Sequence, residues 1–168
     1  MKEVAKLITK SGEPTFVVLS AMSGTTNSLV EISNYLYKKN PDGANEVINR
    51  LEEKYLQHIE ELYSNDEYKT RTKDFLLSEF NLLRSYTKGM FTSFEEKIVV
   101  AQGEIMSTNM VNNYLQEQGV KSTLLDALSF MRTNKNSEPD PTYIKEHLAS
   151  VLSQWPGQQI YITQGFIC

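Results

Sequence analysis

Three short apolar segments, separated from one another by helical sequence, restrict the fold of this chain more than any other feature. They are TFVVLS (residues 15–20), KSTLLDA (121–127) and QIYIT (159–163). The first is a continuous run rich in β-branched residues, which is typical of a strand covered on both faces in a parallel sheet. Strands that alternate with helices predict an α/β fold with a mostly parallel sheet. Three strands are few for 168 residues, so we expect the sheet to be partial.

Helical periodicity occupies most of the remaining chain. Apolar residues recur at helical spacing in four stripes, which are Val4, Leu7 and Ile8; Leu29, Ile32 and Leu36; Ile48, Leu51, Tyr55, Ile59 and Leu62; and Leu76, Phe80, Leu83 and Met90. Residues 94–102 are apolar almost all round in their second half, so we expect an internal helix there. A last helix is predicted over residues 142–153, with Thr142 as its N-cap. The charges between the stripes are interpreted as solvated helix faces; they are Glu52, Glu53, Lys54, Glu60 and Glu61.

Composition excludes several classes of protein. The 17 Lys and Arg residues against 21 Asp and Glu residues give a formal net charge of −4, which argues against non-specific nucleic-acid binding. The single cysteine, Cys168, excludes an internal disulfide and a CxxC-type zinc site. No apolar run approaches the ~20 residues of a membrane span, and the first residues lack the apolar stretch of a signal peptide. We therefore expect a cytoplasmic protein without a nucleic-acid or membrane partner.

The common catalytic motifs are missing from this sequence. It contains no GxGxxG, GxxxxGK[ST], GxSxG or HExxH pattern. His58 and His147 stand alone and are expected to be surface helix residues rather than metal ligands. The motifs therefore predict neither a catalytic residue nor a metal site.

The segment VVLSAMSGTTNSL, residues 17–29, combines a predicted strand, a turn of small residues and a helix beginning near Asn27. In open α/β sheets, ligands bind where strands end and helix N-termini begin. Small residues allow a ligand to approach the backbone, and free N–H groups at a helix N-terminus favour an anionic group. The simpler interpretation is an N-capped loop in which the serine and threonine hydroxyls only hydrogen-bond the backbone of the turn and bind no ligand.

The segment AQGEIMSTNM, residues 101–110, places one carboxylate on a face of apolar and small residues. If the helix continues through Gly103, Glu104 shares that face with Ser107 and Val111. A buried carboxylate needs a cationic or hydrogen-bonding partner, or its pKa rises. No Lys or Arg lies three or four residues away, so the partner is either a distant basic side chain or the ammonium group of a ligand.

Four segments in this order resemble the amino-acid kinase domain of aspartate kinases. They are VVLSAMSGTTNSL, QGEIMST, LLDALSFMRTN and YITQGFI, and together they extend over nearly the whole chain. The resemblance implies a three-layer α/β/α sandwich with a helix-rich insertion over about residues 42–118. Residues 1–168 would then be a partial domain, the aspartate-binding half, without an ACT domain.

The resemblance also implies an activity and a set of binding residues. The activity is ATP-dependent phosphorylation of the side-chain carboxylate of L-aspartate to 4-phospho-L-aspartate, in the biosynthesis of lysine, threonine and methionine. Thr26 and Glu104 fall on aspartate-contacting positions, and Glu104 would bind the substrate ammonium group. Ser20 falls in the floor of the active site, and Phe166 falls on a position that lines the aspartate pocket.

Two parts of the family pattern are missing. The Lys-Phe-Gly-Gly strand that precedes the first helix, and the glycine-rich stretch, nucleotide-binding half and ACT domains that follow the last strand, have no counterpart in these residues. The parent enzyme is expected to use ATP with Mg²⁺ and to form a homo-oligomer. This chain alone is expected to bind neither cofactor tightly and to be inactive, because phosphoryl transfer depends on positioned charge.

Three alternatives remain open at this point. The helix-rich region could be the surface of a non-catalytic interaction module, or the chain could belong to another small-molecule kinase of the same fold. The 168 residues could also be a gene product that starts late and ends early.

Overall fold

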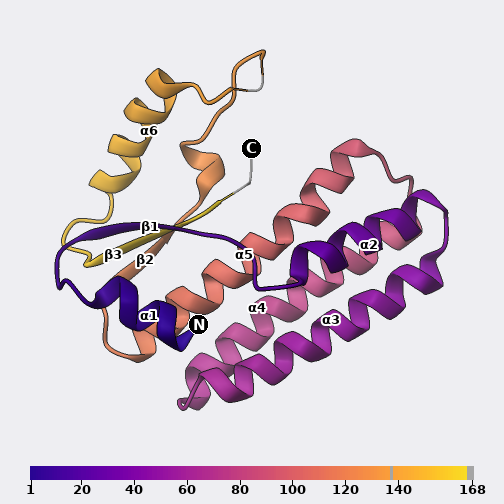
Figure 1. The fold of residues 1–168 in the computed structure, drawn as a ribbon, viewed down its shortest axis with the longest axis horizontal. Coiled ribbons are helices and arrows are strands. Elements are labelled where there is room, and N and C mark those ends of the chain that lie inside the picture. The colour runs from indigo at the N-terminus through magenta and orange to yellow at the C-terminus, as the bar shows by residue number, and fades with distance from the viewer. Residues whose placement is uncertain (137, 166–168) are drawn as a thin grey trace.

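The computed structural model describes residues 1–136 and 138–165 and shows an α/β fold in three layers (Figure 1). Helix α6 lies on one side of the sheet, and α1 and α5 lie on the other (Figure 1). The elements follow one another in this order: α1 (Lys2–Thr9), β1 (Thr15–Leu19), α2 (Thr25–Tyr37), α3 (Pro41–Leu62), α4 (Asp66–Ser85), the 3₁₀ turn η1 (Tyr86–Lys88), α5 (Ser93–Glu117), β2 (Ser122–Leu125), the 3₁₀ turn η2 (Ala127–Ser129), α6 (Pro141–Ser153) and β3 (Ile160–Gln164).

The three strands form one parallel sheet in the order β1-β3-β2. Ile162 of β3 lies opposite Val17 of β1 and opposite Leu124 of β2. Because all strands run the same way, their carboxyl ends meet at one edge, where Gly165 N–H donates to the Leu19 carbonyl at 2.9 Å. The predicted α/β class with a partial parallel sheet is confirmed, and each strand lies within one or two residues of its predicted bounds.

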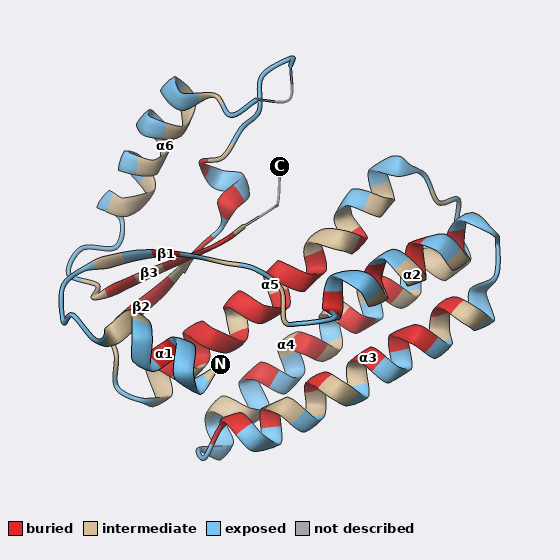
Figure 2. Ribbon diagram, in the orientation of Figure 1, coloured by how far each residue is buried: buried red, intermediate tan, exposed pale blue. Residues whose placement is uncertain are grey.

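Helices α2 to α5 pack into a bundle beside the sheet, with their buried faces turned toward one another (Figure 2). The predicted stripes of α2 and α3 are entirely buried, and so is the stripe of α4 as far as Leu83. The Tyr55 and Phe80 rings meet edge to face at 5.8 Å in this core. Met90 was wrongly included in that stripe: α4 ends at Ser85, and Met90 lies in the following loop with 87% of its surface exposed.

Burial of the first two elements differs from the sequence-based expectation. Phe16 and Val18 are 41% and 60% exposed, so β1 is fully covered on one face only. Residues of α1 and α5 pack against the face that carries Val17, whereas the opposite face is covered only in part, by the Phe130 ring at 6.4 Å from that of Phe16. In α1 the buried residue is Ala5, whereas Leu7 of the predicted stripe is 71% exposed.

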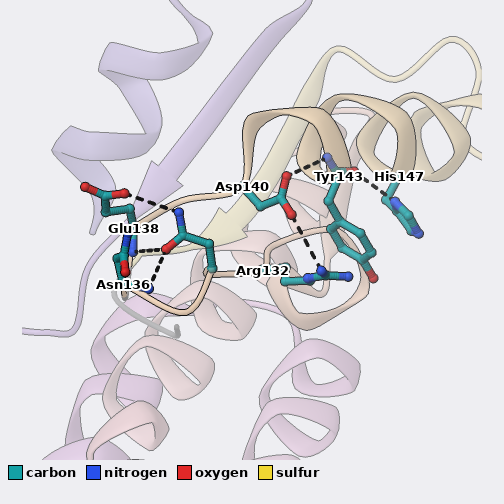
Figure 3. A network of polar contacts seen from close by, with 7 residues as sticks. Arg132, Asn136, Glu138, Asp140, Tyr143 and His147 are labelled. Atoms are coloured by element: carbon teal, nitrogen blue, oxygen red, sulfur yellow. Dashed lines mark hydrogen bonds and ion pairs between the residues drawn. The ribbon is translucent and has the colours of Figure 1, made fainter.

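Helix α6 begins one residue earlier than predicted, and Thr142 is not its N-cap. The N-cap is Asp140, whose carboxylate accepts from the Tyr143 N–H at 3.2 Å (Figure 3). The same carboxylate pairs with the Arg132 guanidinium at 3.7 Å, and this guanidinium lies 4.8 Å from the centre of the Tyr143 ring. Pro141 takes the first helical position, where its missing N–H costs no hydrogen bond.

The two cap assignments make opposite predictions for a pair of alanine variants. We expect Asp140→Ala to lower the free energy of unfolding by about 1 kcal/mol, because the Tyr143 N–H loses its acceptor. Thr142→Ala should change it by less than about 0.5 kcal/mol, as is usual for an exposed residue outside such a contact. Urea unfolding followed by circular dichroism measures both. Equal losses in the two variants would contradict the observed cap.

Candidate functional site

The loop of residues 20–24 connects β1 to α2 at the carboxyl edge of the sheet, and α5 holds it in place. The Ala21 N–H donates to Glu104 Oε1 at 3.1 Å, and the Ser107 hydroxyl donates to the Ser20 carbonyl at 2.8 Å. Helix α5 continues through Gly103, as the prediction for Glu104 required. The two segments that the sequence analysis singled out therefore lie against each other, although more than 80 residues separate them in the chain.

Gly103 permits this close approach of helix and loop. A Cβ atom at Gly103 would lie 2.8 Å from the Ala21 Cβ and 3.4 Å from the Thr25 Cγ2. The first distance is shorter than real Cβ contacts. The space beside Gly103 is thus taken by the loop itself.

Glu104 is buried, with 4% of its surface exposed. Its Oε1 has the Ala21 N–H as partner, but its Oε2 is buried with no hydrogen-bond partner among the described residues. None of the ion pairs within residues 1–136 and 138–165 includes Glu104. Of the two partners that the sequence left open, a distant Lys or Arg does not pair with Glu104 among the described residues.

The environment of Glu104 changes its acidity. Burial raises the pKa of the Glu104 carboxyl above its ordinary value, and the hydrogen bond from Ala21 opposes this rise. Burial also raises the pKa of the nearby Tyr55 hydroxyl to about 12; its hydrogen bond with Thr25 acts against this, and the Glu104 charge adds to it. Tyr55 is therefore a neutral phenol at physiological pH.

The two threonines that open α2 have different environments. Thr25 is fully buried, and its Oγ1 lies 3.1 Å from the Tyr55 hydroxyl. Thr26, the predicted binding residue, is exposed in the first turn of α2. Neither the Thr26 N–H nor the Asn27 N–H has a backbone acceptor among the described residues, as is usual at a helix start. This end of α2 consequently presents free donors next to the loop.

The remaining predicted residues are placed as follows. Ser20 is exposed at the end of β1, and its carbonyl is held by Ser107. Phe166 lies outside the described residues. Ser20, Thr26 and Glu104 thus belong to one region, namely the loop, the start of α2 and the adjoining turn of α5.

A cavity of about 460 Å³ opens beside the loop. Its lining includes Leu19, Ser20, Ser23 and Ser107, together with Lys54 and His58 from α3. The sequence analysis did not identify Lys54 and His58 as site residues, because their surroundings in the sequence are typical of a solvent-exposed helix face. The spacing of four residues, which places both side chains on one face of α3, was the available signal.

The described residues contain neither a metal-binding cluster nor a membrane-spanning helix. No group of three or more His, Cys, Asp or Glu side chains in them is placed to hold a metal ion. Likewise, none of the helices in this part of the chain combines the length and apolarity needed to cross a membrane.

Comparison with known sequences identifies related proteins. A sequence model described as the amino acid kinase family matches residues 1–168. The chain is 27% identical over 169 residues to the bifunctional aspartokinase/homoserine dehydrogenase 2 of Escherichia coli (strain K12), covering 98% of this chain and 20% of that protein. It is 26% identical over 170 residues to the lysine-sensitive aspartokinase 3 of the same strain, covering 99% of this chain and 37% of that protein. The chain thus spans only a fifth to somewhat over a third of these relatives.

Solved structures show the same likeness. A crystal structure of E. coli aspartokinase III in complex with aspartate and ADP, in the R-state, matches with a TM-score of 0.79 and 26% identity. A second, in complex with lysine and aspartate in the T-state, matches with a TM-score of 0.69 and 23% identity, and supports the fold alone. These matches cover 98% of this chain and 36% or 37% of the other.

The raised pKa of Glu104 predicts a pH-dependent stability. A carboxyl with a higher pKa in the folded than in the unfolded chain binds more protons when folded, so stability falls as pH rises from below the unfolded pKa through the folded one. Glu104→Gln removes this contribution. We expect the stability of the variant relative to the unsubstituted chain to improve between pH 4 and pH 7, as measured by urea unfolding. If the difference in unfolding free energy between Glu104→Gln and the unsubstituted chain stays constant over this pH range, Glu104 is not desolvated.

Proposed function

The chain belongs to the amino acid kinase family, and from this premise we propose that it carries the aspartate-binding part of an aspartate kinase. The activity of such an enzyme is transfer of the γ-phosphoryl group of ATP to the side-chain carboxylate of L-aspartate, forming 4-phospho-L-aspartate and ADP. Support comes from the two E. coli relatives, which are aspartokinases, and from the matched structure of aspartokinase III, which holds aspartate and ADP. In this proposal, residues 1–168 are a partial domain and about residues 42–118 are its helical insertion.

The observation that carries the proposal is the unpartnered Oε2 of Glu104. An ionised carboxylate with one buried oxygen lacking a donor is unfavourable, and an ammonium group supplies both the donors and the opposite charge. The α-ammonium group of an amino acid is a ligand of that kind. Glu104 would therefore fix the orientation of aspartate by its amino end.

The start of α2 supplies the complementary donors. The Thr26 hydroxyl and the N–H groups of Thr26 and Asn27 lie at the positive end of the α2 dipole, which favours a carboxylate. Ser20, at the carboxyl end of β1, extends this set of hydroxyl groups. A dicarboxylate with an ammonium group would thus be held at both ends by this chain alone.

ATP as the phosphoryl donor is part of the proposal. When bound, the nucleotide supplies the group that is transferred, and Mg²⁺ would neutralise its charge. Among the described residues, no group of three or more His, Cys, Asp or Glu side chains is placed to hold that ion. The homo-oligomeric state, the cytoplasmic location and the roles in lysine, threonine and methionine synthesis stay predictions.

Calorimetric titration of the 168-residue chain with L-aspartate tests the role of Glu104. We expect aspartate to bind more tightly than succinate, which has both carboxylates but no ammonium group. Glu104→Gln should weaken aspartate binding by roughly tenfold or more, the usual worth of a charged hydrogen bond, and leave succinate binding unchanged. Glu60→Gln, an exposed charge change on α3, is the control and should leave both affinities as they are.

Two results would contradict the proposal. One is equal affinity for aspartate and succinate, which would remove the ammonium-binding role. The other is tighter binding of acetylglutamate or uridylate than of aspartate, which would indicate a different kinase of the same fold.

Turnover by the isolated chain is a separate prediction. We expect a coupled ADP-release assay with aspartate and ATP to give a rate far below the ~1–100 s⁻¹ of ordinary kinases. The reason is that phosphoryl transfer needs charge neutralisation at the transferred group, and the family's Lys-Phe-Gly-Gly motif has no counterpart in these residues. A rate within that range would show that the 168 residues hold a complete catalytic site.

A further inference from the structure

We propose that Lys54 makes the cavity beside residues 20–24 a binding site for a carboxylate or phosphate group. Lys54 lies on α3 and reaches across to the loop, where its Nζ donates to the Ser23 carbonyl at 2.7 Å. An ammonium group carries three N–H donors, so two remain for a ligand. The cavity of about 460 Å³, which Lys54 lines together with Ser20 and Ser107, lies within the usual size range for small-molecule sites.

The position of Lys54 is electrostatically unusual. Its Nζ would lie 3.6 Å from a Cβ atom at Gly24, and Gly24 is the N-cap of α2. A cation at a helix N-terminus meets the positive end of the helix dipole, an arrangement that is unfavourable without an anion. The ammonium group and the helix end therefore add to the same positive potential, and both lie at the carboxyl edge of the sheet.

Acidic residues do not cancel this potential within the cavity. Its lining, as far as the chain is described, contains no Asp or Glu. An adjoining hollow shares Met1 and His58 with it and is also lined by Lys2, Glu3 and Glu61. The anion is therefore expected at the Lys54 end of the cavity, away from Glu3 and Glu61.

His58 lies one turn from Lys54 on α3 and also lines the cavity. Its Nδ1 lies 3.0 Å from the Lys54 carbonyl, one turn earlier in α3. A carbonyl only accepts hydrogen bonds, so Nδ1 is the donor in this contact. This contact fixes the ring next to the Lys54 side chain.

The inference deepens the proposed function and rests on it in one respect. If Glu104 binds the ammonium group of the substrate, Lys54 binds an anionic group of the same ligand set, either a substrate carboxylate or a phosphate. A carboxylate and a phosphate are both small oxyanions. The role of Lys54 can be tested apart from that of Glu104 with anions that lack an ammonium group, because such ligands do not need Glu104.

Calorimetric titrations with succinate and with inorganic phosphate, at constant low ionic strength, test the site on the 168-residue chain. We expect at least one of them to bind, and Lys54→Met to weaken that binding at least tenfold. Lys54→Arg should largely retain it. Lys97→Met removes the same charge from an exposed position on α5 and is the matched control, with affinity expected within twofold of the unsubstituted chain. Binding of succinate alone assigns a carboxylate, and binding of phosphate alone assigns a phosphoryl group.

A second measurement needs no substitution and so does not depend on how Lys54→Met folds. Acetylation of lysine amines, followed by mass spectrometry, should be slowed severalfold at Lys54 by the bound anion and unchanged at Lys97. The proposal is overturned if neither anion binds at tens of millimolar, if Lys54→Met binds as well as the unsubstituted chain, or if Lys54 is not protected. If Glu104→Gln keeps its preference for aspartate over succinate while Lys54→Met still loses anion binding, the role of Glu104 fails and that of Lys54 stands. The two proposals can therefore fail separately.

Discussion

The packing of α5 against the loop that follows β1 is the contact on which the rest of this structure depends. Glu104 and Ser107 bind backbone groups of Ala21 and Ser20, and Gly103 lets the two backbones come close enough for these bonds to form. These two hydrogen bonds are partly buried, and breaking them costs free energy, so a shift of the loop along α5 is unfavourable. The end of β1 and the start of α2 are therefore set by α5, and the sheet and the helical bundle meet at this point.

Local periodicity predicts most of the elements of this fold, because α2, α3 and α4 bury the apolar stripes that their spacing defines. It fails where burial depends on distant parts of the chain. The run 15–20 is typical of a strand covered on both faces, yet Phe16 and Val18 are exposed because α1 and α5 cover only the opposite face of β1. Which helices cover a strand is a non-local property, and no pattern within six residues contains it.

The same distinction separates the predicted from the missed site residues. Glu104 is identifiable because a single carboxylate on an otherwise apolar helix face is a local anomaly. Lys54 is not, since it lies in a run of charged residues and differs from its neighbours only in reaching another element, the Ser23 carbonyl. Asp140 and Thr142 illustrate the point on a smaller scale: both are good N-cap residues two positions apart, and the backbone conformation decides between them.

Two features of the site are unfavourable for folding when considered alone. A carboxylate is desolvated with one oxygen unpartnered, and an ammonium group lies at the positive end of a helix. Local rules of this kind are broken mainly where function requires it.

The loop of residues 20–24 contacts both groups, Glu104 through Ala21 and Lys54 through Ser23, so the two opposite charges approach it from different helices. A ligand that carries both an ammonium and an anionic group would relieve both costs at once, and a ligand with only one of them would relieve one. In the proposed function, selectivity for an amino acid over a simple dicarboxylate would come from Glu104, because both ligands carry an anionic group for Lys54.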